Sequence, residues 1–527
     1  MTTPSQRAVL AREPHVAAGP VTRPPTRYDG GPVWMRVVPP VATLAVLLWG
    51  ISGSSYWRDE SATLAAVQRP FAQLVRMLGH VDAVHGAYYV IMWPLVRVAG
   101  SSPLVTRFPS AVAMAVAAAL VAALGRRLVS PATGLAAGLI FAVLPVVSLY
   151  GQDARSYAMV TALATGASYL LVRLITAPSR RRRWAAGYGA CLAAVGILNF
   201  FGLLLIAAHA VTVVVACLRE GDRRRRRSLA LCWLAAAAGA ALLTSPVVLL
   251  AWVERSQLAW LNAPGIGTIA GLAQLVGAGL MPAGLGIIVV CGLLVSALSG
   301  RAALRRGWPV MLPALAVPWL AVPPVLLLAA SALTPLYTFR YVLFCVPGGA
   351  LLAGAGLAAI GRAIATGLGR DPAGAVRTWL RALGWAAGAA VLAMITALGF
   401  GAQLSVRGPA GHEDNIRRAD QIVAANMRPG DAVIYDTPAD ENLTAAYPYG
   451  LARLTNIAQY QSPIVSGTLA GTTLPAPAVR QRIAGVSRLW VVEVHHRTRL
   501  PVLQGLGLRQ LRIWHTADLW LFLYATH

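Results

Sequence analysis

Long apolar runs alternate with short polar turns along most of the chain. Many of these runs reach roughly 18 residues, which lets a helix cross a hydrocarbon core about 30 Å thick. The pattern predicts about eleven membrane-crossing helices, at residues 33–52, 104–124, 132–150, 158–176, 185–201, 203–218, 229–252, 268–299, 309–330, 342–360 and 383–402. We therefore expect an all-α polytopic membrane bundle.

Two stretches after the first run have a different pattern. Residues 61–79 place apolar residues at helical spacing opposite glutamines and arginines, which predicts an amphipathic helix in the membrane plane, broken at Pro70. A helix of a soluble loop domain is the alternative. Residues 87–99 are apolar but short and contain Pro94 and Arg97, so we interpret them as an interfacial or re-entrant piece.

The composition agrees with a membrane protein, because 57% of the 527 residues are hydrophobic and only 12% are charged. Average soluble domains carry about 25% charged residues. The net charge of +26 comes entirely from arginine, since the chain has no lysine, and this bias suggests a high-GC genome such as that of an actinobacterium. The arginines form short runs between apolar segments and no aromatic-interleaved basic surface, which argues against a nucleic-acid partner.

The arginine runs also predict the orientation of the chain in the membrane. Runs at residues 126–127, 180–183 and 223–227 follow alternate apolar segments, and the positive-inside rule places them in the cytoplasm. The N-terminus is then cytoplasmic and the C-terminal region extracytoplasmic. Counting residues 87–99 as a crossing would put residues 126–127 outside, which disfavours that count.

The ends of the chain differ in composition from its middle. Residues 1–33 are rich in proline, arginine and threonine, and we expect a disordered cytoplasmic tail. Residues 34–403 form the predicted membrane domain. Residues 404–527 predict a small extracytoplasmic α/β domain, with a helix at 416–427 and strands at 432–435, 489–494 and 519–524. This domain either binds and positions a substrate or caps the bundle.

Four polar clusters lie at the predicted outer ends of the apolar segments. They are Asp59–Glu60, His80–His85, Asp153–Tyr157 and Arg340–Tyr341. Ionisable residues at membrane depth usually mark functional sites. Guanidinium groups match the oxygens of a phosphate, and a neighbouring carboxylate can deprotonate an acceptor hydroxyl. The clusters therefore predict glycosyl transfer from a lipid-phosphate sugar at the outer membrane surface.

The order of these motifs resembles the GT-C superfamily of integral membrane glycosyltransferases. The resemblance is strongest to the bacterial dolichyl-phosphate-mannose-protein mannosyltransferase-like branch, which includes the lipid A aminoarabinose transferases. It is carried by Asp59–Glu60 after the first span, by the stretches 85–89 and 151–157, and by Arg340–Tyr341 with Pro347. It covers roughly residues 34–400 and is weak beyond them.

The resemblance implies an inverting transfer of a hexose or pentose, with mannose as the expected sugar, from a polyprenyl-phosphate donor in the bilayer. Asp59 would be the general base, and Glu60 would orient the acceptor or share that role. The residues expected to bind substrate are His80, Asp82, His85, Tyr89, Asp153, Arg155, Tyr157, Arg340 and Tyr341. The acceptor would be a glycan, a glycolipid or a protein, although the C-terminal region does not resemble the β-trefoil of the eukaryotic protein mannosyltransferases.

Other interpretations of the same residues stay open at this stage. Asp59 and Glu60 also suit the N-terminal turn of a helix, and the arginines could simply extend to the membrane interface. We assign no metal site, but a divalent ion held by His80, Asp82 and His85 is an alternative. At the level of function, a transporter of lipid-linked sugar or polymer is the alternative to an enzyme. A non-catalytic membrane scaffold is a third and weaker alternative.

Overall fold

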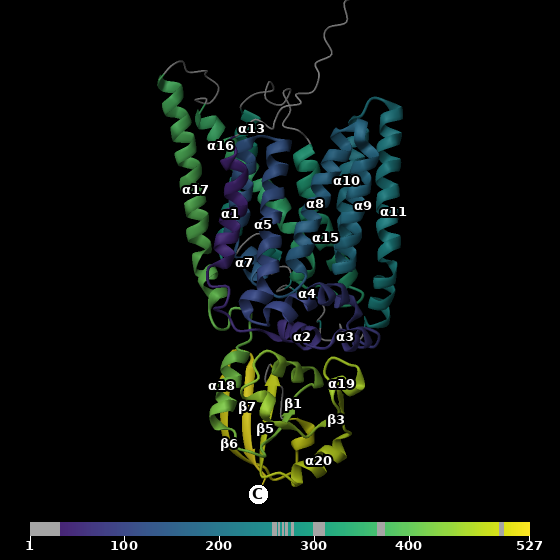
Figure 1. Ribbon diagram of the computed structural model, residues 1–527. Helices are drawn as coiled ribbons and strands as arrows, with labels where there is room; N and C mark the ends of the chain where they lie inside the picture. The colour runs from purple at the N-terminus through teal and green to yellow at the C-terminus, as the bar shows by residue number, and fades with distance from the viewer. Residues whose placement is uncertain are drawn as a thin grey trace, which may run out of the picture.

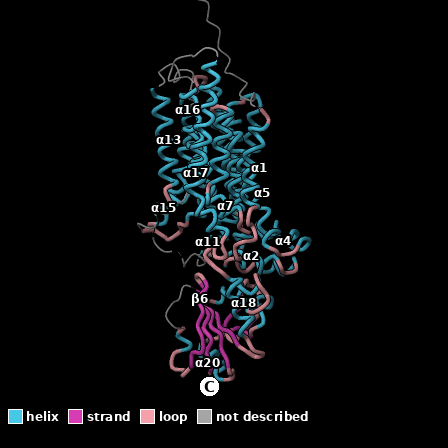
Figure 2. Tube along the Cα trace, turned by 90° about the vertical axis from the view of Figure 1, so that its left-hand side faces the viewer, coloured by secondary structure: helices cyan, strands magenta, loops and turns pink. Residues whose placement is uncertain are grey.

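The computed structural model consists of a long helical bundle and a smaller α/β unit at one end of it (Figure 1). It describes residues 32–255, 261, 264–265, 268, 272–275, 279–298, 311–365, 375–494 and 500–526. Strands occur only in the α/β unit among these residues, and Figure 2 shows them below the helices. The predicted tail at residues 1–33 lies almost wholly outside the described residues.

The bundle consists of apolar helices that run side by side (Figure 1). They are α1 (Trp34–Leu48), α5 (Pro103–Leu128), α6 (Pro131–Val143), α7 (Pro145–Gly151), α8 (Tyr157–Thr176), α9 (Arg181–Leu198), α10 (Leu205–Arg219), α11 (Arg223–Val253), α13 (Met281–Leu298), α15 (Met311–Ser331), α16 (Val346–Ala365) and α17 (Ala375–Arg407). The polytopic helical fold predicted from the apolar runs is confirmed.

Fewer helices than the predicted eleven meet a strict criterion for crossing a membrane. Seven of the described helices are long and apolar enough, and an eighth results if α6 and α7 count as one span. These two helices are bent by 65° because Pro145 begins α7 and Leu144 before it is extended. Of the remaining predicted spans, α1 and α13 are shorter apolar helices, and α9 begins in an arginine run.

Short helices cover the end of the bundle that faces the α/β unit (Figure 1). They are α2 (Arg58–Val67), α3 (Phe71–Leu78), the 3₁₀ turn η1 (Ala83–His85) and α4 (Gly86–Ala99). Pro70 is the N-cap of α3, so the amphipathic stretch breaks where proline predicts it. At 14 residues, α4 is too short to cross a bilayer by itself.

The arginine-rich turns meet at the opposite end of the bundle. Arg127 donates to the Thr176 hydroxyl at 2.9 Å, Arg181 donates to the Arg225 carbonyl at 2.8 Å, and Arg362 donates to the Ser130 hydroxyl at 3.4 Å. Arg107 and Arg127 lie at opposite ends of α5, about 30 Å apart along its axis at 1.5 Å per residue. This separation matches the thickness of a hydrocarbon core.

The α/β unit is built on a five-stranded sheet with the order β2-β1-β5-β7-β6. Its elements are α18 (Ile416–Asn426), β1 (Ala432–Tyr435), β2 (Thr455–Asn456), β3 (Gln459–Gln461), α19 (Pro463–Ser466), β4 (Thr472–Thr473), α20 (Ala476–Ala484), β5 (Arg488–Val494), β6 (Arg509–Thr516) and β7 (Leu519–Ala525). Strands β2, β1 and β5 are parallel, whereas β7 pairs antiparallel with β5 and β6. The helix and the three strands predicted here are observed.

Alternating side chains of the sheet form two small cores, as the pleat of a strand requires. Val433, Trp490 and Leu521 pack with the helix α18 on one face. Ile434 and Phe522 pack with α20 on the other. The edge strand β6 was not predicted from the sequence, because it is mostly exposed and therefore lacks an apolar pattern.

Candidate active site

Asp59 in the first turn of α2 lies between two arginines from distant parts of the chain. Its Oδ2 atom is 3.4 Å from Nη1 of Arg340 and 4.0 Å from Nε of Arg155. Arg340 belongs to the 3₁₀ helix η6 (Phe339–Cys345), and Arg155 belongs to the turn between α7 and α8. The Asp59 side chain keeps 27% of its surface exposed, while those of Arg155 and Arg340 keep 7% and 14%.

The charge of Asp59 follows from these neighbours. Burial alone would raise the pKa of its carboxyl, but Arg340 and Arg155 outweigh burial and hold the pKa below its ordinary value. Asp59 is therefore ionised at neutral pH. Two cations hold this partly exposed carboxylate in place. If a bound anion attracts those cations, the carboxylate can accept a proton from a bound substrate.

The loop before α4 and the first turn of α4 bring His85, Asp82 and Tyr89 close to the same arginine. Arg155 donates from Nη2 to Nε2 of His85 at 2.8 Å, and Tyr89 donates its hydroxyl hydrogen to the Asp82 carboxylate. Burial raises the pKa of Asp82 to about 6. Burial and the Arg155 charge lower the pKa of His85 well below its ordinary value, so its ring is neutral and accepts from Arg155.

Asp153, Tyr157 and Tyr341 complete the wall around Asp59. Asp153 accepts a hydrogen bond from the Trp57 indole at 3.0 Å, and the ring of Trp57 lies 5.4 Å from the Arg340 guanidinium. Burial and the nearby Glu60 raise the pKa of Asp153 well above its ordinary value. Tyr157 packs edge-on against Tyr150. The Tyr341 ring stacks on that of Phe201.

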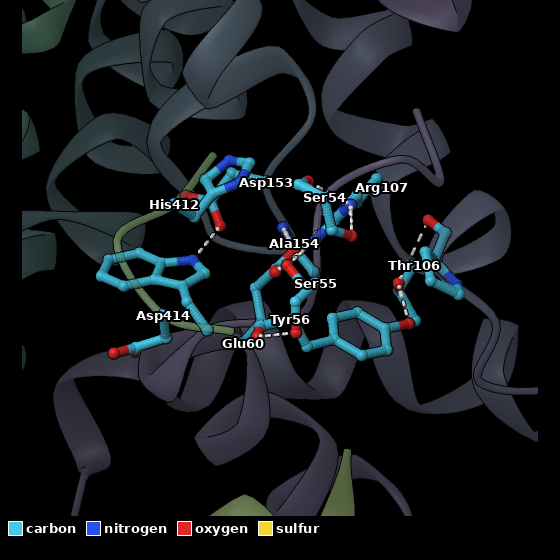
Figure 3. A network of polar contacts seen from close by, with 12 residues as sticks. Ser54, Ser55, Tyr56, Glu60, Thr106, Arg107, Asp153, Ala154, His412 and Asp414 are labelled. Atoms are coloured by element: carbon cyan, nitrogen blue, oxygen red, sulfur yellow. Dashed lines mark hydrogen bonds and ion pairs between the residues drawn. The ribbon is translucent and has the colours of Figure 1, made fainter. Parts of the chain in front are cut away.

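Glu60 has surroundings unlike those of Asp59, although the two are adjacent. Its side chain is fully buried, and its two oxygens accept hydrogen bonds from Nε and Nη2 of Arg107 at 2.8 and 2.7 Å (Figure 3). It also accepts from the Ala154 backbone N–H at 2.9 Å. Arg107 in turn donates to the carbonyls of Ile51 and Ser55. The structure thus places Glu60 in a support network behind the site.

Arg107 was not among the site residues predicted from the sequence. The available signal was a single arginine inside an otherwise apolar run, close to the start of the predicted span at 104–124. Such a residue needs a charged partner at membrane depth. The segment between α17 and α18 was also overlooked, although its Asp414 pairs with Arg58 at 3.0 Å and its His412 lies 6.3 Å from the Trp57 ring.

His80 does not join the other predicted site residues. Its side chain is exposed, and its Nδ1 lies 2.8 Å from the carbonyl oxygen of Arg76 on the preceding helix. The alternative metal site would need His80 beside Asp82 and His85, and these residues do not gather. Among the described residues, no group of three or more histidine, cysteine, aspartate or glutamate side chains is arranged to hold a metal ion.

An apolar groove of about 470 Å³ lies between α4, α5, α8 and α9. Its lining residues are Ala87, Ile91, Ala113, Val116, Met159, Ala162, Leu163, Ala194, Ile197 and Leu198. Two of these lining residues lie close to the polar site, one along the chain and the other through a hydrogen bond. Ala87 follows His85 by two residues, and the carbonyl of Leu198 accepts a hydrogen bond from Ser156, the neighbour of Arg155.

Comparison with known proteins finds a family model and several solved structures that match this chain. The family model for dolichyl-phosphate-mannose-protein mannosyltransferases matches residues 87–252. The crystal structure of ArnT from Cupriavidus metallidurans in the apo state matches with a TM-score of 0.57 at 14% identity, covering 94% of this chain and 97% of that one. Its structure bound to undecaprenyl phosphate matches with the same TM-score and identity, covering 94% and 98%.

An archaeal structure has a similar fold. The apo oligosaccharyltransferase of Archaeoglobus fulgidus matches with a TM-score of 0.54 at 10% identity, covering 88% of this chain and 69% of that one. A search of curated protein sequences finds no significant relative. The chain therefore has a GT-C-like fold, as the resemblance in its sequence predicts.

Proposed function

We propose that this protein is a membrane glycosyltransferase that moves a sugar from a polyprenyl-phosphate donor to an acceptor hydroxyl. The observation that carries the proposal is Asp59 between Arg155 and Arg340, with an apolar groove nearby whose lining residue Ala87 follows His85 by two residues. The arginines suit the donor phosphate and the groove suits its isoprenoid chain. The GT-C fold and the mannosyltransferase family match support the same chemistry.

The proposed reaction needs one base and one phosphate clamp. The acceptor oxygen attacks the anomeric carbon from the face opposite the phosphate, and Asp59 takes the acceptor proton as the new C–O bond forms. The bond between the anomeric carbon and the phosphate oxygen breaks, and the electron pair stays on the polyprenyl phosphate. Arg155 and Arg340 stabilise the negative charge that builds on this leaving group. A single displacement inverts the anomeric configuration.

The same two arginines explain how Asp59 could become basic at the right moment. Without donor, Arg340 and Arg155 hold the pKa of Asp59 low. A bound phosphate would compete for both guanidinium groups, because their planar forks match its oxygens. This competition would weaken their hold on Asp59 and raise its proton affinity. The base would therefore be strongest when the donor is in place.

The remaining predicted residues take supporting roles in this proposal. His85 contacts Arg155, Asp82 accepts from Tyr89, and Asp153 holds the Trp57 indole, whose ring lies under the Arg340 guanidinium. Tyr157 and Tyr341 line the wall. Glu60 positions the site through Arg107 and takes no proton, because both of its oxygens accept hydrogen bonds from buried donors. His80 lies outside the substrate site.

The orientation of the chain forms part of the proposal. The arginine-rich turns would lie in the cytoplasm by the positive-inside rule, which places Asp59 and residues 404–527 on the outer face. Residues 34–403 would form the catalytic membrane domain. The α/β domain borders the site, and we propose that it meets the acceptor, which would be a glycan, a glycolipid or a protein.

Mannose is the sugar to test first, since the matching family model describes dolichyl-phosphate-mannose-dependent enzymes. Membranes with the wild-type protein would receive radiolabelled polyprenyl-phosphate mannose or a polyprenyl-phosphate pentose, together with cell-envelope acceptors. Labelled glycoside formation that Asp59→Asn abolishes supports the proposal. Movement of lipid-linked sugar across the membrane without a new glycosidic bond would instead favour a transporter.

A further inference from the structure

The segment that joins α17 to α18, residues 408–415, passes directly beside the first turn of α2. We call this segment the strap. The carbonyl of Pro409 accepts a hydrogen bond from the Ser55 backbone N–H at 3.0 Å. Further along the strap, Asp414 is completely buried against Arg58, which precedes Asp59 in the chain. The strap therefore touches both the loop that enters α2 and the turn that carries the proposed base.

Asp414 supplies a helix cap that the local sequence lacks. The first N–H groups of a helix have no partner within the helix, and a short polar N-cap side chain usually satisfies one of them. The N-cap of α2 is Trp57, whose side chain caps nothing. Instead, the Asp414 carboxylate Oδ2 accepts the Arg58 backbone N–H at 2.9 Å and Arg58 Nε at 3.0 Å.

His412 supports the residue before this cap. Its Nε2 lies 2.9 Å from the carbonyl oxygen of Leu149 on α7, which fixes the ring against the bundle. The ring stacks on Trp57 at a centroid distance of 6.3 Å. Figure 3 shows His412 and Asp414 on the same stretch of chain beside the network of Glu60. Two strap side chains thus hold the two residues that lead into Asp59.

Asp414 also adjusts the charge around Asp59. The groups with the largest effect on the pKa of the Asp59 carboxylate are Arg340, Arg155, His85 and Arg58, and Asp82 and Asp153 also interact with it. Arg58 has Asp414 as its ion-pair partner, so part of its positive charge is compensated within the strap. The other groups come from η6, from the turn before α8 and from η1. None of them contacts the strap carboxylate in the described ion pairs.

We propose that Asp414 is a positioning residue, which fixes the first turn of α2 from the strap and so couples the α/β unit to the placement of Asp59. The proposal rests on the proposed function in one respect, namely that Asp59 is the base. Asp414 acts through the Arg58 backbone and side chain and does not contact the substrate. Its loss should loosen the turn of Asp59 while the rest of the bundle stays folded.

Hydrogen exchange of the full-length protein in lipid nanodiscs tests the positioning step without any activity. The matched control is Asp420→Ala, because Asp420 is an equally buried carboxylate that caps the backbone N–H groups of Gly450 and Leu451 within the α/β unit. Asp414→Ala should speed exchange at the start of α2 by about fivefold, the effect of losing one cap. Asp420→Ala should speed exchange near residue 450 only.

The exchange result decides the proposal in either direction. Amides at the start of α2 that exchange within twofold of the wild-type rate in Asp414→Ala would overturn it. So would an equal effect of Asp420→Ala on those amides. Because the readout needs no substrate, a wild-type protein without transferase activity would refute the proposed function and leave the exchange result interpretable.

Kinetics with the polyprenyl-phosphate donor separate positioning from general damage. Asp414→Ala should lower kcat by about 100-fold with the donor KM within threefold, since small misplacements of a catalytic group cost rates of this size. Asp414→Asn keeps an oxygen for the Arg58 N–H but removes the charge, so the acid limb of the kcat profile should move to lower pH. Loss of activity that only follows the loss of folded protein, with an unmoved acid limb, would contradict the proposal.

Discussion

Glu60 and Arg107 form an ion pair with no solvent exposure on either side chain, with 2.7 Å between Oε2 and Nη2. Adjacent to Glu60, Asp59 remains partly open to solvent between Arg155 and Arg340. Neighbouring residues on a helix project about 100° apart, so one carboxylate enters the core while the other faces the site. The structure thus divides the acidic pair into a support and a candidate base.

Glu60→Gln should destabilise the protein strongly, because it leaves the buried Arg107 charge without its partner. The expected cost is about 3–5 kcal/mol, typical of breaking a buried pair. Thermal unfolding in detergent measures this loss. The double variant Glu60→Leu with Arg107→Met should recover part of it, since neither charge is then left alone. If the Glu60→Gln protein is stable but no longer transfers sugar, Glu60 has a catalytic role.

Asp59→Asn should lower kcat by about 10²–10⁴-fold, the usual contribution of a general base, with little change in donor KM. Folding should be affected less than in Glu60→Gln, because the Asp59 side chain is 27% exposed and lies at longer distances from its arginines. His80→Ala is the matched control from the same polar clusters and should keep nearly full activity. Retained transfer by Asp59→Asn in a steady-state assay would falsify the assignment of the base.

Arg340→Ala should weaken the binding of unreactive polyprenyl phosphate by about 10- to 100-fold, since hydrogen bonds to charged groups contribute about 1.5–3 kcal/mol. Arg340→Lys should recover only part, because an ammonium lacks the planar fork. Binding can be measured by calorimetry in nanodiscs. Arg418→Ala, which removes an exposed arginine of α18, serves as the control for a general loss of charge. Equal losses in both variants would argue against a phosphate clamp.

The pH profile of the Arg340→Ala protein offers an independent test of the same cluster. Arg340 lowers the pKa of Asp59, so its removal should raise that pKa. The acid limb of kcat/KM should therefore move to higher pH, because Asp59 would be protonated over a wider range. Arg418→Ala should leave the limb in place. A limb that stays in place or moves to lower pH in Arg340→Ala would show that another group titrates.

Asp82 should make the protein less stable as the pH rises. Its pKa is raised to about 6 in the fold by burial, above its value in an unfolded chain. The folded state therefore holds the extra proton near pH 5, and the stability this gives is lost as the pH increases through about 6. Asp82→Asn should flatten this part of the profile of unfolding temperature against pH. An unchanged slope between these pH values would contradict the assignment.

The apolar groove gives a prediction about the lipid part of the donor. Ala162→Trp should fill part of the groove and raise the KM for a long-chain donor by about tenfold, or ~1.4 kcal/mol. A donor analogue with a very short isoprenoid chain should be affected less. Val214→Trp adds the same side chain to an exposed position of α10 and is the control. Equal KM values for the long-chain donor in both variants would show that the groove does not bind the isoprenoid chain of the donor.

The sequence by itself determined the class of fold and indicated most of the residues that gather at the candidate site. Apolar runs long enough to cross a bilayer as a helix strongly favour membrane helices. A proline such as Pro70 breaks a helix in its interior. The polar residues that interrupt this pattern, among them Asp59, Arg155 and Arg340, are conspicuous because charge is costly in an apolar segment. Strands β1, β5 and β7 were also predictable, because each is buried and therefore has an apolar sequence.

Only the tertiary structure decided how these residues divide the work. Periodicity gives the face of a helix but not its partner, so the sequence left Glu60 to orient the acceptor or share the role of Asp59. In the structure, Arg107 donates to both oxygens of Glu60. Likewise, Asp414 caps a helix that begins 356 residues earlier in the chain, a distance no local pattern can bridge. Long-range contacts depend on packing of the whole chain, and that packing separates the candidate base from its supports.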